Sequence, residues 1–348
     1  MQRFKTIREW VRNADAAAIA RARIIGTLMG ALVFGVFLYH HVFFVPAQES
    51  DMAAVALVPS AGLSGVVSRG EGDSISPQQP TEDVATEVPE VLETVETAPA
   101  GGDRSALIGP DEHFSARAIA ITDETGARSL YEKNSDAELP IASLTKLMTA
   151  VIVLEHMSLD DVIAVSAAAV VTDGVAGNVR AGETIVARDL LKIMLIVSSN
   201  DAAAAFADVF AGRGMDLVAL MNEKAAELGM AHTHFVNPHG LDEDGHVSTA
   251  SDLARLTAYS FTHRTIWDIL AEKSDTVFSA DARITHQLLS NNELVQAGNA
   301  LILGGKTGYT TMALGCMITK LISGEIIVVL GSADRAEETE RLIHTMHD

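Results

Sequence analysis

The sequence predicts an α/β fold in which an antiparallel sheet, flanked by helices, carries a mostly helical insertion. Strand-like apolar runs occur near residue 120 and return after residue 275. Amphipathic helical patterns fill the interval between them, and a further helical pattern closes the chain. Strands at both ends with helices between them are what such an insertion produces. Ahead of this part, the sequence predicts an N-terminal transmembrane helix and a disordered linker.

The predicted elements follow in chain order from about Asp111. Residues 116–123 and 127–131 alternate as a hairpin does around Glu124-Thr125-Gly126. Helical spacing is found at residues 144–156, 187–197, 201–210, 215–228 and 249–261. Strand-like runs follow at residues 276–278, 284–289, 313–321 and 325–331, and residues 335–346 form a last helix. We therefore assign residues 111–348 to one globular catalytic domain.

Residues 24–45 form an apolar run without Asp, Glu, Lys or Arg. A helix of this length covers about 30 Å, enough to cross a bilayer. Six basic residues precede the run, and the first charges after it are acidic. The positive-inside bias predicts a cytoplasmic tail at 1–23, a single-pass anchor in the cell membrane at 24–45, and an extracytoplasmic catalytic domain. The alternative is a cleaved signal peptide, but the run is longer than a usual signal core.

Residues 46–110 are predicted to be a disordered acidic linker. They are rich in Pro, Gly, Ser, Thr and Glu and show no sustained apolar period. Between residues 48 and 114 there are thirteen acidic and two basic residues, which contribute much of the formal net charge of −21. Such a charge excludes nucleic acid as a partner, because phosphates require a basic surface.

Cys316 is the single cysteine of the chain, so no intramolecular disulfide can form. It lies in an apolar strand-like run, which predicts a buried thiol. No Cys/His cluster has zinc spacing. We expect neither a metal ion nor a cofactor.

Ser143-Leu144-Thr145-Lys146 is the first candidate for chemistry. If a helix begins at Ser143, Lys146 lies one turn away on the same face. Burial would then lower the lysine pKa and leave a neutral amine able to accept the serine proton. The structural alternative is that Ser143 merely caps the helix.

Two further motifs could complete a site. Lys306-Thr307-Gly308 has glycines on both sides, which let a strand approach a ligand closely, although a solvent-exposed hairpin would look the same. Ser198-Ser199-Asn200 falls in the break between two helices, where Ser198 or Asn200 could also cap a helix. A second Ser-x-Asn occurs at residues 290–292, but order and spacing favour the first.

In this order the three motifs are those of the serine penicillin-recognising enzymes. Within that superfamily the chain resembles the low-molecular-mass D-alanyl-D-alanine carboxypeptidases, peptidase family S11. The stretches that carry the likeness are residues 141–149, 197–203, 235–242 with 246–250, and 305–310. The resemblance covers about residue 116 to the C-terminus and implies a β-lactamase/transpeptidase-like fold.

The resemblance also implies roles for individual residues. Ser143 attacks the amide between two D-alanines of a peptidoglycan stem peptide, Lys146 is its base and Ser198 relays protons. The implied substrate-binding residues are Asn200, Lys306, Thr307, Gly308 and Tyr309, with Arg335 as a second carboxylate contact. Backbone N–H groups of Ser143 and Tyr309 would form the oxyanion hole. β-Lactam antibiotics are expected to inhibit by acylating Ser143. His239 and His246 are left out of the catalytic set, since their loop more simply shapes the site and caps the helix from Thr249.

Several alternatives stay open. Many relatives carry a further β-rich domain, which we do not expect here because the predicted catalytic domain runs to residue 348. This expectation weakens the carboxypeptidase prediction relative to a D,D-endopeptidase that cleaves cross-links. A slow-turnover penicillin-binding sensor or wall-binding scaffold would keep the same motifs. A class A β-lactamase is disfavoured because it needs a Glu-x-x-Leu-Asn loop, which the sequence does not contain.

Overall fold

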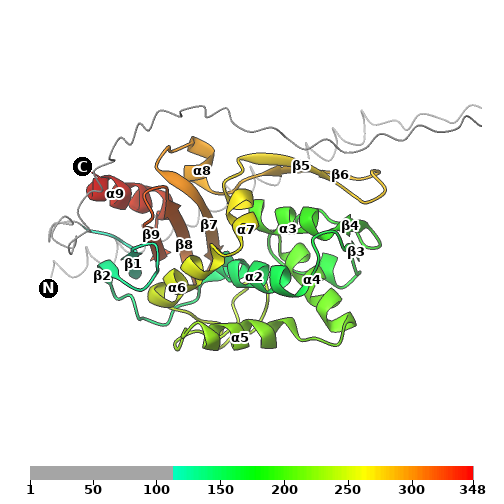
Figure 1. Cartoon of the computed structure of the whole chain (residues 1–348), viewed down its shortest axis with the longest axis horizontal. Coiled ribbons are helices and arrows are strands. Elements are labelled where there is room, and N and C mark those ends of the chain that lie inside the picture. Colours follow the sequence, from blue (N-terminus) through cyan, green and yellow to red (C-terminus); the bar gives the residue numbers. More distant parts are fainter. Residues whose placement is uncertain (1–112, 348) are drawn as a thin grey trace, which may run out of the picture. The chain divides into compact units, whose positions relative to one another are not determined.

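The computed structural model describes residues 113–347, and they are built around one five-stranded sheet (Figure 1). Its strands are β1 (Ala118–Thr122), β2 (Ser129–Lys133), β7 (Ile302–Thr310), β8 (Leu314–Leu321) and β9 (Ile326–Ser332). They lie in the order β2-β1-β9-β8-β7, and every neighbouring pair is antiparallel. The predicted antiparallel sheet is therefore confirmed, and β7, which carries Lys306, lies at one of its edges.

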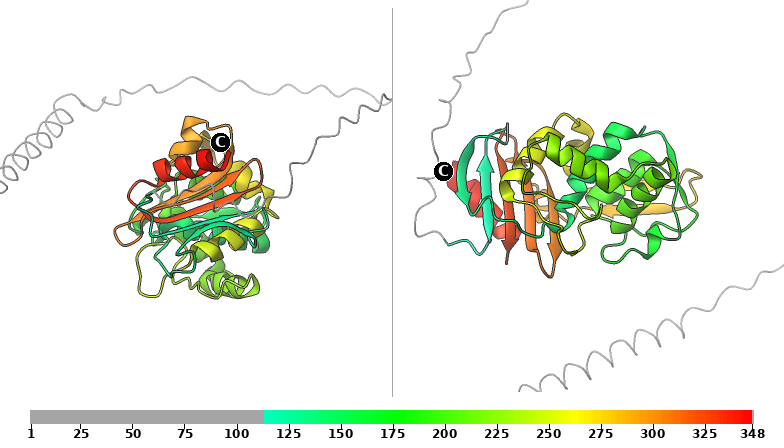
Figure 2. Two further views of the ribbon diagram at one scale, coloured as in Figure 1. Left: turned by 90° about the vertical axis from the view of Figure 1, so that its left-hand side faces the viewer. Right: turned by 90° about the horizontal axis from the view of Figure 1, so that it is seen from below.

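Helices cover both faces of this sheet because its strands bury side chains on both sides. In β1, Ile119 and Ile121 pack with Leu342 and Ile343 of α9 (Arg335–His347). The alternate residues of β1, Ala118 and Ala120, join the larger core that holds α2 (Lys146–His156) and α6 (Ala250–Ser260). The sheet is thus the middle layer, as the left view in Figure 2 shows.

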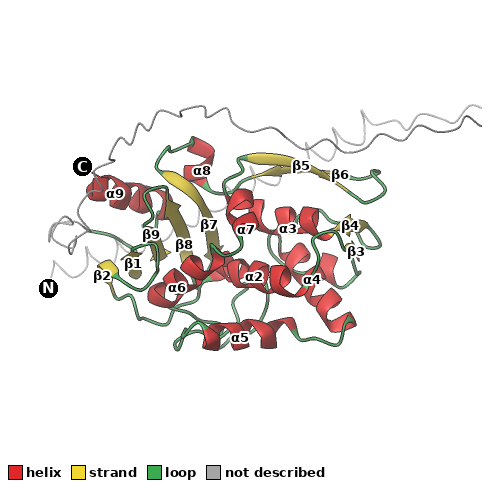
Figure 3. Ribbon diagram, in the orientation of Figure 1, coloured by secondary structure: helices red, strands yellow, loops and turns green. Residues whose placement is uncertain are grey.

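The helical insertion lies between β2 and β7 in sequence (Figure 3). It comprises α2, α3 (Ala187–Ile196), α4 (Asn200–Gly212), α5 (Leu217–Glu227), α6 and α7 (Arg264–Leu270), with the short α8 (Glu293–Ala297) before β7. Capping side chains explain several starts: Ser199 caps α4, Asp216 caps α5, Thr249 caps α6 and Asn292 caps α8. The predicted helices are confirmed to within a few residues, while α7 and α8 had no predicted counterpart.

Four short strands form two ribbons apart from the main sheet. One pairs β3 (Val162–Ala164) with β4 (Thr184–Val186), and the other pairs β5 (Ser274–Phe278) with β6 (Thr285–Leu289). The strand-like runs at 276–278 and 284–289 are real strands. They pair with each other and pack Val277 and Leu288 into the helical core, so they do not extend the catalytic sheet.

The predicted tail at 1–23, anchor at 24–45 and linker at 46–110 lie outside the described residues and stay predictions. Within residues 113–347, no helix has the length and apolar character needed to span a bilayer.

Candidate active site

Ser143 lies in a single 3-10 turn, η1 (Ala142–Thr145), that runs directly into α2. The sequence predicted that Ser143 opens a helix, and this short turn takes that place. Lys146 follows three residues later and is fully buried, and its Nζ lies 2.8 Å from Ser143 Oγ. The predicted one-turn spacing therefore brings the hydroxyl and the amine into direct contact.

The Lys146 amine contacts three oxygen atoms. Besides Ser143 Oγ, Nζ lies 2.7 Å from Asn200 Oδ1 and 2.7 Å from the His239 carbonyl. Burial lowers the pKa of Lys146 well below its usual value of 10.5, the positive charge of Lys306 lowers it further, and Asp201 opposes both. A neutral amine has two N–H bonds and one lone pair. With the N–H bonds directed to Asn200 and His239, the lone pair is left for the proton of Ser143.

The Ser198-Ser199-Asn200 motif forms the sharp turn between α3 and α4. Ser198 adopts a left-handed conformation with φ of 64° and accepts a 2.8 Å hydrogen bond from Lys306 Nζ. Ser199 caps α4 by accepting from the Ala202 amide. The capping alternative thus applies to the middle residue of the motif, and the side chains of Ser198 and Asn200 are free to face the two lysines.

Lys306 is also fully buried, and its Nζ donates to Ser198 Oγ and to the Thr307 carbonyl. Burial lowers its pKa to about 7, with a further contribution from the positive charge of Arg335. Gly308 explains how β7 comes so near the nucleophile, because a Cβ there would lie 2.9 Å from the Ser143 backbone nitrogen. Any larger residue would push the strand away from Ser143.

Thr307 contacts Asn291, a residue outside the predicted site. Its Oγ1 donates a 2.8 Å hydrogen bond to Asn291 Oδ1. Asn291 also bonds the end of α3, through its backbone nitrogen to the Ile196 carbonyl. It belongs to the second Ser-x-Asn, at 290–292, which was rejected on order and spacing. That pattern was the available signal, and the structure brings both Ser-x-Asn patterns to the same strand.

The two remaining predicted residues are Tyr309, which follows Gly308 on β7, and Arg335, which begins α9. Tyr309 follows Gly308 and its side chain is 65% exposed, so it rims the site. Arg335, at the start of α9, donates to the Gly308 carbonyl at 2.8 Å and to Glu293 at 2.8 Å. Its guanidinium is therefore already engaged with the strand, and its predicted contact with a substrate carboxylate stays a prediction.

Comparison with known proteins agrees with this geometry. A profile of the family described as D-alanyl-D-alanine carboxypeptidase matches residues 106–333, well over half of the chain. The chain belongs to this family. Peptidase family S11 was the resemblance expected from the motifs, and the predicted α/β fold with an antiparallel sheet is likewise confirmed.

Two relatives show the range of the family. The D-alanyl-D-alanine carboxypeptidase DacF of Bacillus subtilis is 32% identical over 66% of this chain. A D-alanyl-D-alanine endopeptidase of Pseudomonas aeruginosa is 36% identical over 60% of it. The chain spans 60% of the length of the first relative and 68% of the second.

Solved structures show the same fold. A D-alanyl-D-alanine carboxypeptidase from Mycobacterium tuberculosis has a TM-score of 0.63 and 26% identity, covering 69% of this chain and 93% of that one. The Streptomyces K15 DD-transpeptidase has a TM-score of 0.62 at 23% identity, covering 67% and 97%. The second likeness concerns the fold alone.

In this member of the family, residues 235–246 form a loop that closes over Lys146. Gly240 lets the loop pass η1, because a Cβ at its φ of 87° would lie 1.9 Å from the Ala142 carbonyl. Thr149 fixes the loop from α2 by donating to the Pro238 carbonyl at 2.7 Å. The loop thus supplies the His239 carbonyl to Lys146 by its backbone, which no residue type in the sequence could reveal.

The two histidines of this loop act in its structure. His246 contacts Thr145 Oγ1 at 2.8 Å and accepts from the Val236 amide. Burial lowers the pKa of both His239 and His246 to about 4, so both rings are neutral near pH 7. Their exclusion from the catalytic set agrees with this placement, and Thr249 does cap α6 as predicted.

Asp242 of the same loop fixes the far end of β7. Its carboxylate accepts from Thr310 Oγ1 at 2.6 Å and from the Met312 amide at 3.3 Å. The turn after Tyr309 is therefore tied to the loop that covers Lys146.

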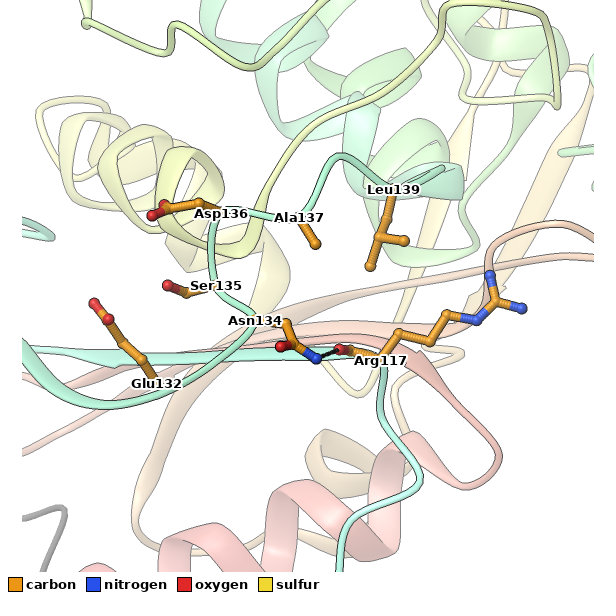
Figure 4. Close-up of a pocket in the computed structure, with 7 residues that line it drawn as sticks. All are labelled: Arg117, Glu132, Asn134, Ser135, Asp136, Ala137 and Leu139. Carbon is orange, nitrogen blue, oxygen red and sulfur yellow. Dashed lines mark hydrogen bonds between the residues drawn. The ribbon is translucent and has the colours of Figure 1, made fainter.

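An open hollow of about 670 Å³ lies elsewhere on the domain (Figure 4). Its lining residues are Arg117, Glu132, Asn134, Ser135, Asp136, Ala137 and Leu139. None of them belongs to the predicted site, and the polar ones are mostly exposed. We assign the chemistry to the Ser143 cluster, where the buried amines are. Within residues 113–347, no group of three or more His, Cys, Asp or Glu side chains is placed to hold a metal ion.

Proposed function

We propose that the protein is a serine-type D-Ala-D-Ala carboxypeptidase that trims peptidoglycan stem peptides through an acyl-enzyme. The observation that carries the proposal is the 2.8 Å contact between Ser143 Oγ and a fully buried Lys146 amine whose other two contacts are hydrogen-bond acceptors. This arrangement suits a neutral lysine acting as general base to an activated serine.

In the proposed reaction, Ser143 Oγ attacks the carbonyl carbon of the D-Ala-D-Ala amide while its proton passes to Lys146. The negative oxygen that develops is stabilised by the backbone N–H groups of Ser143 and Tyr309. The C–N bond then breaks as the leaving D-alanine nitrogen takes a proton from Lys146, relayed through Ser198. A water molecule, activated in the same way, hydrolyses the ester on Ser143.

Recognition of the terminal carboxylate is assigned to Lys306 and Thr307. The Lys306 ammonium supplies the positive charge, and its contact with Ser198 Oγ places that charge next to the proton relay. Thr307 supplies a hydroxyl, whose proton would turn from Asn291 Oδ1 to the carboxylate when the substrate binds. Asn200 would bond the substrate amide. A β-lactam carries a carboxylate near its reactive amide, so we propose that it occupies the same groups and acylates Ser143.

A D,D-endopeptidase that cleaves cross-links is the second candidate. The 36% identity to the endopeptidase of Pseudomonas aeruginosa favours it, because this relative is matched over 68% of its own length. An endopeptidase and a carboxypeptidase of this kind both attack the carbonyl carbon of a D-alanine. They differ in the group that leaves when the amide bond breaks. A slow-turnover sensor would stop at the acyl-enzyme, and a class A-like β-lactamase would hydrolyse penicillin quickly.

We also propose that residues 24–45 anchor the protein in the cell membrane, with the catalytic domain on the extracytoplasmic side. The apolar run without Asp, Glu, Lys or Arg, its basic N-terminal flank and the acidic residues that follow support this orientation. Peptidoglycan lies on that side of the membrane. The acidic linker would then set how far the domain reaches from its anchor.

The test uses the full-length chain, purified in mild detergent, beside its Ser143→Ala variant. Both are incubated with fluorescent penicillin, a pentapeptide ending in D-Ala-D-Ala, and a cross-linked stem dimer. We expect covalent labelling and release of D-alanine by the wild type and neither by the variant. Cleavage of the dimer without D-alanine release would favour the endopeptidase, and labelling without turnover of any substrate would favour the sensor. No labelling of the folded wild type would overturn the acyl-enzyme proposal.

A further inference from the structure

The segment Asp173–Gly177 lies beside the site and is hydrogen-bonded to Asn200. It follows the short 3-10 turn η2 (Ala169–Val171), and its residues are mostly exposed. The carbonyl of Asp173 accepts a 2.7 Å hydrogen bond from Asn200 Nδ2, and the carbonyl of Val175 accepts from the Asn200 backbone nitrogen at 2.8 Å. Neither carbonyl belongs to a sequence motif.

The orientation of the Asn200 carboxamide decides what Lys146 can do. The Asp173 oxygen can only accept, so the carboxamide nitrogen faces it and Oδ1 faces Lys146. In that orientation Oδ1 takes up one N–H bond of a neutral Lys146. If the carboxamide were turned round, its N–H would compete with Ser143 for the lysine lone pair. The direction of the Lys146 lone pair therefore depends on the Asp173 carbonyl, which contacts Asn200 and through it Lys146.

Ser199 removes the simplest alternative, that Asn200 is held only to cap α4. Ser199 already accepts from the Ala202 amide as the cap of this helix. Asn200 is 4% exposed, and both ends of its carboxamide are engaged within the protein. Its side chain is thus free of capping, and one of its N–H bonds and one of its lone pairs link Asp173 to Lys146.

The segment is held firmly enough to fix that link. The Gly177 amide donates to both carboxylate oxygens of Asp201, at 2.8 and 3.0 Å, and Asp201 is 2% exposed. Ser199 Oγ donates to the same carboxylate. Gly174 has a φ of 92°, and a Cβ there would lie 2.4 Å from Asn200 Nδ2. The close approach of the Asp173 carbonyl to Asn200 therefore requires glycine at position 174.

We propose that the segment Asp173–Gly177 is a positioning element for the reaction: the Asp173 carbonyl fixes the Asn200 carboxamide and so aims the Lys146 lone pair at Ser143. The inference rests on the proposed acyl-enzyme function. Asp173 and Gly174 touch no reacting atom and act through Asn200.

Gly174→Ala in the full-length chain tests the proposal, with Gly182→Ala as the matched control. Gly182 has a similar positive φ of 80°, but a Cβ there would meet nothing within 4 Å. Both substitutions strain the backbone alike, and only one pushes on Asn200. The readout is the second-order rate of acylation by fluorescent penicillin per titrated active site, measured from pH 5 to pH 9.

We expect Gly174→Ala to lower the plateau rate about 10- to 100-fold, as misplacement of a catalytic group does. Loss of the Asn200 oxygen also removes an acceptor that favours the protonated amine, so the acid limb of the profile should move to lower pH. Gly182→Ala should match the wild type in both respects. A purely structural role would lower the fraction of active protein and leave the rate per active site and the limb unchanged.

A wild-type measurement keeps the proposal testable if Gly174→Ala fails to fold. The Asn200 side-chain N–H that faces Asp173 should exchange slowly with solvent in an NMR experiment, and fast exchange of both side-chain protons would overturn the link. The proposal is also overturned if Gly174→Ala acylates like Gly182→Ala while the wild type is normally active. An unreactive wild type would instead count against the proposed function.

Discussion

Two buried polar clusters of this domain behave in opposite ways. The lysine cluster consists of Lys146 and Lys306 with their acceptors. The Glu338 junction lies on the α9 face of the sheet, where the Glu338 carboxylate accepts from the backbone amides of Ser115 and Ala116 and from Ser332 Oγ. Both clusters join segments that are distant in sequence, and both are almost fully removed from solvent.

The difference between them is the kind of group around the buried side chain: hydrogen-bond donors surround Glu338, whereas oxygen atoms surround the two lysines and a second cation stands near each of them. Glu338 is surrounded by donors, which suit an anion and hold it in place. Among residues 113–347, neither Lys146 nor Lys306 forms an ion pair, and the oxygen atoms that each amine contacts are uncharged. Burial without a paired carboxylate lowers the pKa of both amines. The comparison teaches that a buried carboxyl group that accepts from several donors joins segments of the chain, whereas a buried amine with a second cation nearby is prepared to give up its proton.

The largest expected effect is at Lys146. Lys146→Ala should lower the rate of penicillin acylation about 1000-fold, within the range for removal of a general base. Lys146→Arg keeps a cation but cannot lose its proton, so it should be equally inactive. Stopped-flow labelling with both folded variants measures this. Activity of the arginine variant near that of the wild type would mean that residue 146 serves as a positive charge and not as a base.

The Glu338 junction should show the reverse behaviour, a change in stability with no change in chemistry. Glu338→Ala leaves donors of Ser115 and Ala116 without their acceptor and should cost about 2–3 kcal/mol of unfolding free energy. The exposed Glu340→Ala on the same helix should cost no more than about 0.5 kcal/mol. Urea unfolding gives these values. A Glu338→Ala enzyme that is as stable as wild type but acylates slowly would erase the distinction between the clusters.

Lys306 should give the alkaline side of the pH profile. Its pKa of about 7 means that it is an ammonium below pH 7 and a neutral amine above it. If the ammonium attracts the substrate carboxylate, kcat/KM for the pentapeptide should fall about tenfold per pH unit above this value, while the neutral form of Lys146 sets the acid limb. Lys306→Arg stays charged, so its alkaline limb should move upward. If the alkaline limb of the folded Lys306→Arg variant stays at the pH of the wild type, a group other than Lys306 causes that limb.

The smallest effect is expected at Cys316, which pairs with Gly308 across β7 and β8. Burial raises the pKa of its thiol to about 11, so the same physical cause that makes an amine reactive makes a thiol inert. A maleimide reagent at pH 7.5 should leave native Cys316 unmodified for hours and label it fully in urea. Rapid labelling of the native protein would show that burial at this strand does not control reactivity in the way described.

The sequence predicted the parts of the site whose residues are close together in a short motif. Ser143 and Lys146 lie one helical turn apart, and Ser198, Asn200 and Lys306 belong to motifs whose residue types are themselves the signal. Two further groups were out of reach, because the carbonyls of Asp173 and His239 belong to the backbone, which every residue has. Asn291 lies in the second Ser-x-Asn, which order and spacing along the chain disfavoured, and its role follows from its contact with Thr307.

The fold shows the same division. Periodicity located the helices that bury a continuous apolar face, such as α3 and α6, and the hairpin of β1 and β2. It could not tell which strands share a sheet, because β5 and β6 have the same alternating pattern whether they pair with each other or extend the edge of β7. The pairing of strands is decided by contacts between residues that are far apart in the sequence.

The central claim is that Lys146 is a neutral amine in the resting protein, and its protonation state can be observed directly. NMR of protein with isotope-labelled lysine Nζ, assigned by comparison with Lys146→Arg, would follow the signal of Lys146 through a pH titration. The account predicts the chemical shift of a neutral amine near pH 7, where exposed lysines remain ammonium ions. A Lys146 signal that stays that of an ammonium ion up to pH 9 would contradict it.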